Sequence, residues 1–319
     1  MGQIDIATKM FVSVSDIFAQ IFNVGLFKGD IVVREDGLTD LNSLEDVRLE
    51  GKGKLFEKIR DVKKQSDLGF SLAILGIEDQ DKIHQFMPVR TMMYDAAAYE
   101  GQFRRIIEEC EQKGITIPYG MGVPKGTQVL PVITIIFYTG KEIWDGPRDL
   151  FGLLKVPENK KELLKKYMNN YHIHVIDARH MSDEEINQYS GDLKAFFIML
   201  KEKYDEEMLE GVVAKHRETW YALSTIKKDK RYREYIETVK EEQLTGGVRM
   251  CETLDFIEQR GMERGIERGI EQGRSLGEDL LGKLMEYLLA HHLTEEAKIA
   301  AVDKAARQEM YKKYGIIEE

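Results

Sequence analysis

Two apolar runs, residues 70–77 (FSLAILGI) and 130–138 (LPVITIIFY), stand out in a sequence of otherwise mixed polarity. Runs of this length without alternation are typical of strands that are covered on both faces in an α/β protein. Turn residues at 65–69 precede the first run, so the segment around Asp61 is expected to fold back beside it as a hairpin partner. The same segment also fits a helical period through Leu55, Phe56, Ile59 and Val62, so periodicity alone leaves strand and helix open.

Helical patterns alternate with these strands. Apolar stripes predict a helix over residues 13–22 and a longer one from the first-turn proline Pro88 to about Gly114. Ser182 followed three residues later by Glu185 has the pattern of a capping box, so a helix is expected to start there and to continue to Leu200. Further elements are expected as strands at 30–34 and 172–176 and a helix at 160–167. This alternation indicates a three-layer α/β domain.

The last third of the chain has helical composition and holds an internal repeat. We expect a boundary in the charged stretch 201–211, which gives an α/β domain over 1–205 and a helical part over 206–319. Glycine recurs at every fourth position, at Gly261, Gly265, Gly269, Gly273 and Gly277. On a helix this period forms a bare ridge that a second helix can approach, although each interior glycine costs about 1 kcal/mol relative to alanine. The repeat therefore predicts an oligomerisation or hinge segment, with a flexible linker as the alternative, and a closing amphipathic helix is expected at 294–314.

Acidic and amide side chains follow the first apolar run. Because side chains alternate along a strand, Glu78 and Gln80 are expected on one face and Asp79 on the other. The hairpin would bring Asp61 near Glu78. Two neighbouring carboxylates repel each other unless a cation lies between them, and Mg²⁺ prefers oxygen ligands. The pattern predicts a Mg²⁺ site, whereas acidic residues that merely solvate a strand end are the alternative.

A wider set of motifs resembles a known family. The set consists of Gly76-Ile77-Glu78-Asp79-Gln80, Met87-Pro88-Val89-Arg90, Tyr94-Asp95-Ala96, Tyr99, Gln102 and the stretch LPVITIIFYTGKEIWDGPRDL at 130–150. It resembles the Rpn family of recombination-promoting nucleases, which includes transposase-like proteins, over roughly residues 10–200. The resemblance implies an α/β fold with a PD-(D/E)XK nuclease core. Asp79 and Asp81 depart from the asparagine and serine that the family commonly has, and Gln80 stands where the wider superfamily has lysine.

The resemblance also implies roles for individual residues. Asp61 and Glu78 would bind Mg²⁺, with Mn²⁺ as an alternative ion, and Gln80 would position the attacking water. A first helix in PD-(D/E)XK folds often lends a further carboxylate, for which we select Asp16, although an acid in the first turn of a helix is also favoured by the helix dipole. Arg90, Lys63 and Lys64 are expected to meet DNA phosphates, and a structural salt bridge from Arg90 to Asp95 or Glu78 is the alternative.

Composition limits these expectations. The formal net charge is −10 and the pI is about 5.4, which is the wrong sign for a protein that coats nucleic acid, so a nuclease needs a local basic face. Residues 51–64 carry six lysines or arginines against two acids, and either this basic face or an ordinary solvated surface fits that stretch. The two cysteines, Cys110 and Cys251, are far apart and match no metal or redox spacing. His172 and His174 could share a strand face as a metal pair, but no third ligand has suitable spacing.

These observations predict a Mg²⁺-dependent DNA endonuclease connected with recombination or mobile elements, which acts in the cytoplasm and forms a homo-oligomer through its C-terminal part. No apolar run approaches the roughly 20 residues of a membrane helix, so no membrane partner is expected. The alternative is a nuclease-like DNA-binding or self-assembling scaffold that has lost cleavage, because a neutral Gln80 amide cannot add positive charge to a transition state.

Overall fold

The computed structural model describes residues 3–41, 62–77, 84–120 and 122–317 of the chain. By contacts the chain divides into two compact units, Met1–Thr253 and Leu254–Glu319. We expect the boundary near residue 205, where the composition changes. The structure instead places the segment from there to Thr253 in the first unit. Helix α7 (Arg217–Ile226) accounts for this difference, because it lies against the first helix of the chain, α1 (Gln3–Ser13).

A five-stranded mixed sheet organises the first unit, with the strands in the order β1-β2-β3-β4-β5. β1 to β3 pair antiparallel, and β3 to β5 pair parallel. The predicted hairpin at residues 65–69 and both buried strands are therefore confirmed. The strands are β1 (Leu38–Asp40), β2 (Val62–Ser66), β3 (Ser71–Ile77), β4 (Val132–Tyr138) and β5 (His174–Asp177).

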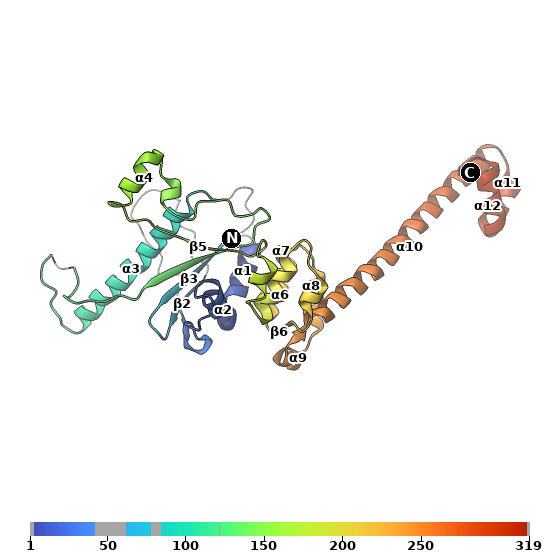
Figure 1. The fold of residues 1–319 in the computed structure, drawn as a ribbon. Helices are drawn as coiled ribbons and strands as arrows, with labels where there is room; N and C mark the ends of the chain where they lie inside the picture. Colours follow the sequence, from blue (N-terminus) through green and yellow to red (C-terminus); the bar gives the residue numbers. More distant parts are fainter. Residues whose placement is uncertain (1–2, 42–61, 78–83, 121, 318–319) are drawn as a thin grey trace. The chain divides into compact units, whose positions relative to one another are not determined.

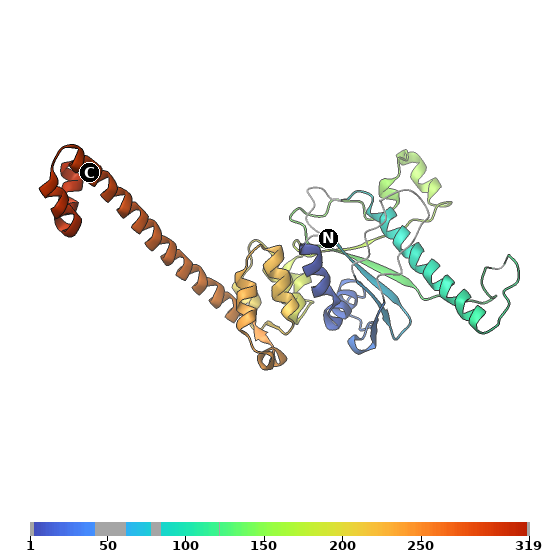
Figure 2. The ribbon, with the colours of Figure 1, turned by 180° about the vertical axis from the view of Figure 1, so that it is seen from behind.

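Helices cover both faces of this sheet, as Figures 1 and 2 show for α3 (Met87–Gln112) on one side of the strands and α2 (Ser15–Gly25) on the other. Alternate residues of β4 serve the two layers. Phe137 contacts Phe196 and Phe197 of α6 (Gly191–Leu200), with ring centres about 6 Å apart. Ile136 and Tyr138 instead pack with Met87 of α3. The three-layer α/β expectation is confirmed.

Polar side chains of α3 fasten this helix to β4 and its approach. Gln102 accepts a hydrogen bond from the Leu130 N–H at 2.7 Å and donates one to the Leu130 carbonyl oxygen at 3.1 Å. Tyr99 accepts from the Val132 N–H at 3.1 Å. Asp95, which is buried, accepts from Thr134 at 2.6 Å and from Tyr171 at 2.5 Å. Three residues of the motifs that resemble the Rpn family therefore hold the helix to the sheet.

The prediction of a strand at residues 30–34 is wrong. This stretch is a loop that leads to the short 3-10 helix η1 (Glu35–Gly37). The Asn23 side chain replaces the partner strand: its oxygen accepts from the Val32 and Val33 N–H groups, and its nitrogen donates to the Val33 carbonyl. A side chain ten residues away thus satisfies the backbone that a sheet would otherwise pair.

The helix expected over residues 13–22 corresponds to α2, and a helix that the sequence analysis did not predict, α1, precedes it, with Val14 in an extended conformation between them. The helix expected from Ser182 to Leu200 is divided into two. The Ser182–Glu185 capping box is confirmed, but its helix α5 (Asp183–Ile186) is short. α6 starts anew at Gly191, whose φ of +54° favours glycine.

The other elements of the first unit lie around this core. A second, two-stranded sheet pairs β6 with β7. The remaining elements are η2 (Phe151–Leu153), α4 (Glu158–Leu164), η3 (Glu206–Leu209), β6 (Val213–Ala214), α8 (Arg231–Thr238), α9 (Glu241–Gly246) and β7 (Val248–Arg249).

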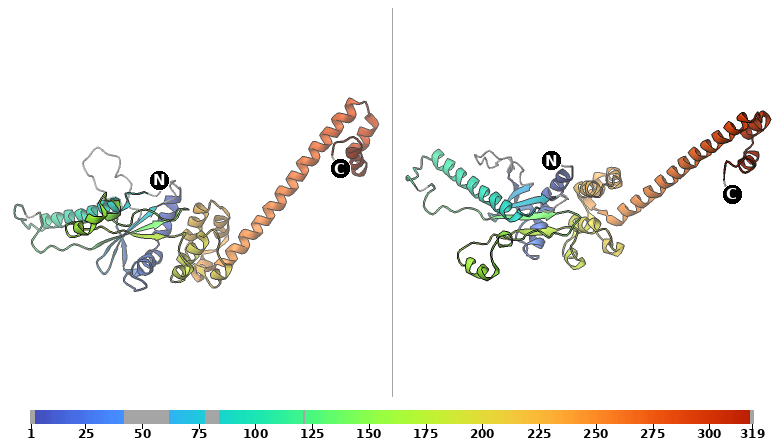
Figure 3. Two further views of the ribbon diagram at one scale, coloured as in Figure 1. Left: turned by 45° about the horizontal axis from the view of Figure 1, so that its top comes forward. Right: turned by 90° about the horizontal axis from the view of Figure 1, so that it is seen from above.

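The second unit contains most of α10 (Met250–Ala290), followed by α11 (Thr294–Val302) and α12 (Lys304–Lys313). The glycine repeat is helical throughout, and the single closing helix expected at 294–314 is two helices. Asp303 divides them, because its carboxylate accepts from the Ala305 and Ala306 N–H groups and caps α12. Figure 3 shows α11 and α12 folded back on the end of α10, where Leu284, Leu288 and Tyr311 are buried. Among the described residues, none of the helices combines the length and apolar character needed to cross a bilayer.

Replacing Gln102 with leucine should destabilise the α/β unit by about 1–3 kcal/mol, because the Leu130 N–H and carbonyl would lose their partner in a largely buried position. Urea unfolding followed by tryptophan fluorescence measures this, since the two tryptophans, Trp144 and Trp220, are both buried in the first unit. The matched control is Gln112→Leu, at an exposed position of the same helix, which should change stability by less than about 0.5 kcal/mol. Equal effects of the two substitutions would contradict a stabilising role for the hydrogen bonds between Gln102 and Leu130.

Candidate functional site

The strand ends that lead to the predicted metal ligands lie at one edge of the sheet. β2 starts at Val62, one residue after Asp61, and β3 ends at Ile77, one residue before Glu78. Val62 pairs with Ile74 in an antiparallel register, so the start of β2 and the end of β3 lie at the same edge. Asp61, Glu78 and Gln80, together with Asp79 and Asp81, lie outside the described residues, and their roles stay predictions.

The parallel strands bring further polar groups to this edge. Tyr138 at the end of β4 pairs with Ile77, and Asp177 at the end of β5 pairs with Tyr138. The Asp177 carboxylate lies 2.8 Å from His180 Nδ1 and accepts from the Trp144 N–H at 2.9 Å. A hollow of about 460 Å³ adjoins these groups and is lined partly by Asp177, His180 and Glu185. The sequence analysis did not select Asp177, because a single acid after a strand carries no distinctive pattern.

The two predicted phosphate-binding lysines of β2 have different surroundings. The Lys64 side chain is almost completely buried, and its Nζ lies 2.6 Å from Asp40 Oδ1 and 3.4 Å from Ser15 Oγ. Its ammonium also lies 5.7 Å from the centre of the Phe18 ring. Lys63 directly precedes Lys64, so its side chain lies on the other face of the sheet. It lines a hollow of about 200 Å³ together with Arg105 of α3. Of the two, Lys63 is therefore the one that borders a hollow, and its phosphate-binding role stays a prediction.

Arg90 lies in the first turns of α3, half-buried. Its Nε donates to the Tyr94 hydroxyl at 3.1 Å, and its guanidinium carbon lies 5.6 Å from the centre of the Tyr94 ring. The alternative prediction for Arg90 is a salt bridge to Asp95. The Asp95 carboxylate instead accepts hydrogen bonds from Thr134 and Tyr171. The phosphate-binding role of Arg90 stays a prediction.

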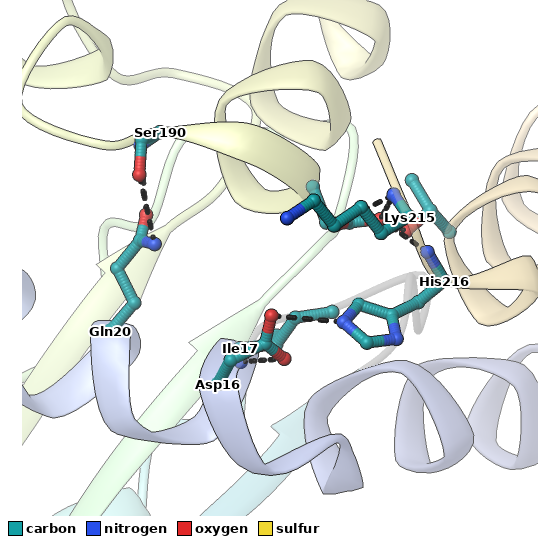
Figure 4. A network of polar contacts seen from close by, with 8 residues as sticks. Asp16, Ile17, Gln20, Ser190, Lys215 and His216 are labelled. Atoms are coloured by element: carbon teal, nitrogen blue, oxygen red, sulfur yellow. Dashed lines mark hydrogen bonds and ion pairs between the residues drawn. The ribbon is translucent and has the colours of Figure 1, made fainter. Parts of the chain in front are cut away.

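Asp16, the predicted third metal ligand, lies in a cluster with Asp192 and His216. Figure 4 shows the Asp16 carboxylate facing the His216 ring. One ligand atom from each residue lies within 4.8 Å of the other two. Asp16 accepts from the Ile17 N–H at 2.8 Å, and its second oxygen lies 2.9 Å from His216 Nε2. The donor types suit a divalent ion, but Asp16 and His216 already bind each other.

Asp192 is the buried member of the cluster. It accepts hydrogen bonds from the Lys215 and His216 N–H groups, which directly precede α7, and from the Thr219 hydroxyl in the first turn of α7. Burial raises the pKa of Asp192 despite these hydrogen bonds. The cluster ties α2, α6 and α7 together. Sequence reasoning missed Asp192 and His216 because neither has a local signal, and His216 lies 200 residues from Asp16 along the chain.

Charge links the two half-buried members of the cluster, Asp16 and His216. The hydrogen bond to Asp16 raises the pKa of His216 despite partial burial, and the charges of Asp192, Asp16 and Glu218 act in the same direction. Burial alone would raise the pKa of Asp16, but the His216 hydrogen bond and charge, with the backbone N–H groups, hold it below its ordinary value. His216 is thus stabilised in its protonated form.

Together, fold and site define an α/β protein with a mixed five-stranded sheet whose polar groups gather at the strand ends. A family profile described as "Putative transposase, YhgA-like" matches residues 38–230, and the chain belongs to this family. The match confirms the resemblance to the Rpn family and associates the chain with mobile elements or recombination. Neither a curated protein nor a solved structure matches the chain.

An NMR titration of the His216 ring should give a midpoint above the ordinary histidine pKa of about 6.5, and Asp16→Asn should lower that midpoint. Because the folded pKa is raised, His216 contributes its stability fully below about pH 6.5 and loses it as pH rises through the folded pKa. The control is Asp149→Asn, which removes the carboxylate 3.8 Å from His172 and should leave His216 unchanged. An unchanged His216 midpoint in Asp16→Asn would contradict the pairing.

Proposed function

We propose that this protein is a metal-dependent DNA endonuclease with a PD-(D/E)XK-type core, acting in recombination or on mobile elements. The observation that carries the proposal is the antiparallel pairing of β2 with β3, whose ends lead to Asp61 and Glu78 at one edge of the sheet. The three-layer architecture and the family match support it.

Each residue of the proposed site has a chemical role. Asp61 and Glu78 would hold Mg²⁺ or Mn²⁺ through carboxylate oxygens, the ligands that these ions prefer. When bound, the ion would supply positive charge to the phosphoryl oxygens and acidify a water molecule. Gln80 would orient that water by hydrogen bonds, since an amide both donates and accepts. Lys63 is the described cation closest in sequence to Asp61 and would supply charge that Gln80 cannot.

A second candidate function is a DNA-binding or self-assembling scaffold that does not cleave. The net charge of −10 and the neutral amide of Gln80 favour it. The presence of both Asp61 and Glu78 favours cleavage. The two functions differ in one measurable property, which is metal-dependent hydrolysis of DNA.

We also propose that the glycine repeat of α10 pairs with the same repeat of a second copy of the chain. The glycines have no atom within 4 Å of an added Cβ at positions 265, 269, 273 and 277. Beside them Met262, Ile266 and Ile270 are 59%, 64% and 67% exposed. An isolated helix carrying five interior glycines is disfavoured by roughly 1 kcal/mol for each, so a partner that covers this surface stabilises it.

The charges of the repeat suit a copy of itself. Glu263 and Arg264 recur as Glu267 and Arg268, so two antiparallel copies can place acidic rows against basic rows. Rows at every fourth residue pack ridge into groove at a crossing angle of about −50°. The proposed contact is therefore short and centred on the glycines.

Plasmid DNA with Mg²⁺ or Mn²⁺ should be nicked by the wild-type protein, and Asp61→Asn or Glu78→Gln should lower the rate by at least about 100-fold, because each removes a charge that holds the ion. Asp36→Asn, which removes an exposed acid paired with Arg34, is the control and should cleave normally. Excess EDTA should abolish all cleavage. If the wild type leaves every form of DNA intact, the scaffold function is the better explanation.

Sedimentation velocity tests the pairing of α10. Ile266→Glu with Ile270→Glu should convert an oligomer to monomer, because carboxylates would replace the apolar row at the contact. Gln272→Glu with Ser275→Glu adds the same charge at exposed polar positions of the same helix and should leave the oligomer intact. A wild-type chain that sediments as a monomer at micromolar concentrations would support the flexible-linker alternative.

A further inference from the structure

A small hollow lies at the same sheet edge as the proposed site, just beyond the end of β4. Its volume is about 90 Å³, and its lining contains three cationic residues and no carboxylate: Ile4, Thr139, Lys141, Arg179, Ile226 and Lys228. Thr139 directly follows Tyr138, which pairs with Ile77, the last described residue before Glu78. The hollow is thus within a short distance along the sheet edge of the point where the chain leaves β3.

A second hollow of about 540 Å³ adjoins the first, because Lys228 lines both. Lys230 and Arg233 line this second hollow, together with polar groups of α7 such as Ser224 and Thr225. We call Lys141, Arg179, Lys228, Lys230 and Arg233 the α7–α8 basic face. These cations come from three separate parts of the chain: Lys141 follows β4, Arg179 follows β5, and Lys228, Lys230 and Arg233 belong to the basic run at residues 227–233 that leads from α7 into α8.

Some carboxylates near this face form ion pairs. Glu237 pairs with Arg233 of the face itself at 2.9 Å, and Asp229 pairs with Arg231 at 2.8 Å. Glu234 and Glu237 both line the second hollow. Within the part of the chain that the structure describes, no carboxylate forms an ion pair with Lys228 or Lys230. An ordinary solvated loop would also carry lysines, but it would not collect cations from three segments around one hollow.

Two further contacts show that positive charge accumulates here. Arg179 donates to the carbonyl oxygens of Thr139 at 2.9 Å and Leu200 at 3.0 Å, which hold the guanidinium in place. Lys227, next to Lys228, donates to the Met199 carbonyl, and burial together with the charge of Arg179 lowers its pKa. An anion would relieve this repulsion.

We propose that the α7–α8 basic face binds the phosphodiester backbone of DNA and positions it over the sheet edge that carries the proposed catalytic residues. This inference rests on the proposed function for its choice of ligand. A run of phosphates fits better than a single phosphate, because the cations extend across two adjoining hollows. Such a face also reconciles DNA binding with a net charge of −10, since local charge governs contact with the backbone.

Fluorescence anisotropy with a labelled 20-base-pair duplex in EDTA, where metal-dependent cleavage cannot occur, tests this face. The test variant is Lys228→Asn with Lys230→Gln; asparagine is chosen because Lys228 has a φ of +56°, a conformation that asparagine tolerates. Removing two phosphate contacts should weaken binding at least about 10-fold at 100 mM salt and reduce the slope of log K against log salt by about 2.

The matched control is Lys160→Asn with Lys166→Gln, which removes two exposed lysines at and just after α4 and should bind like the wild type. Equal affinities and salt slopes for the test and control variants would overturn the proposal. So would competition by inorganic phosphate as effective as that of unlabelled duplex at equal phosphate concentration, because this outcome would mean a single-phosphate site.

Failure of this inference is distinguishable from failure of the proposed function. A wild type that binds DNA through the basic face but does not cleave with Mg²⁺ or Mn²⁺ would overturn the nuclease and support the face. A wild type that cleaves, with the Lys228→Asn/Lys230→Gln variant binding and cleaving equally well, would overturn the face alone. Circular dichroism of the variants should match the wild type, which shows that neither result comes from unfolding.

Discussion

The parallel pairing of β3 with β4 is the constraint on which the first unit depends. Its register runs from Ser71 opposite Val132 to Ile77 opposite Tyr138, so both strands end at the same edge. β4 is an interior strand of the sheet, and helices cover it on both faces. Its alternate side chains pack into two different layers, Phe137 toward α6 and Ile136 toward α3. Glu78 and Gln80 follow the end of β3, and Lys141 follows the end of β4, each within a few residues of these two strand ends.

Sequence patterns predicted the elements whose signals are local. The apolar runs of β3 and β4, the proline at the start of α3 and the capping box at Ser182 each depend on neighbouring residues, and each was confirmed. The patterns failed where a distant or single side chain decides the structure. Asn23 satisfies the backbone of residues 32 and 33, so an apolar segment that reads as a strand becomes a loop.

The same distinction applies to the candidate sites. Asp61, Glu78 and Gln80 could be selected from the sequence because they follow a recognisable strand and match a family motif. The Asp16–His216 contact could not, since the two residues are 200 positions apart and only tertiary packing brings them together. In the α7–α8 basic face, Lys228, Lys230 and Arg233 come from one basic run, and only packing adds Lys141 and Arg179 to them. Conversely Lys64, one of two adjacent lysines in the sequence, is withdrawn from the surface by its ion pair with Asp40, whereas Lys63 is not buried. Because side chains alternate along a strand, Lys63 and Lys64 point to opposite faces of the sheet, although they are the same residue type at adjacent positions.

Helix α7 connects the cluster of Asp16, Asp192 and His216 with the α7–α8 basic face. The backbone just before its start is held by Asp192 and lies beside the Asp16–His216 pair, and its end at Ile226 leads directly into Lys227 and Lys228. A helix of this length is rigid, so contacts that fix one end also fix the position of the cations at the other. The buried Asp192 carboxylate and the neighbouring histidine thus have a consequence beyond stability. By fixing the start of α7 on α2 and α6, they set where the positive charge of an acidic protein meets the edge of its sheet.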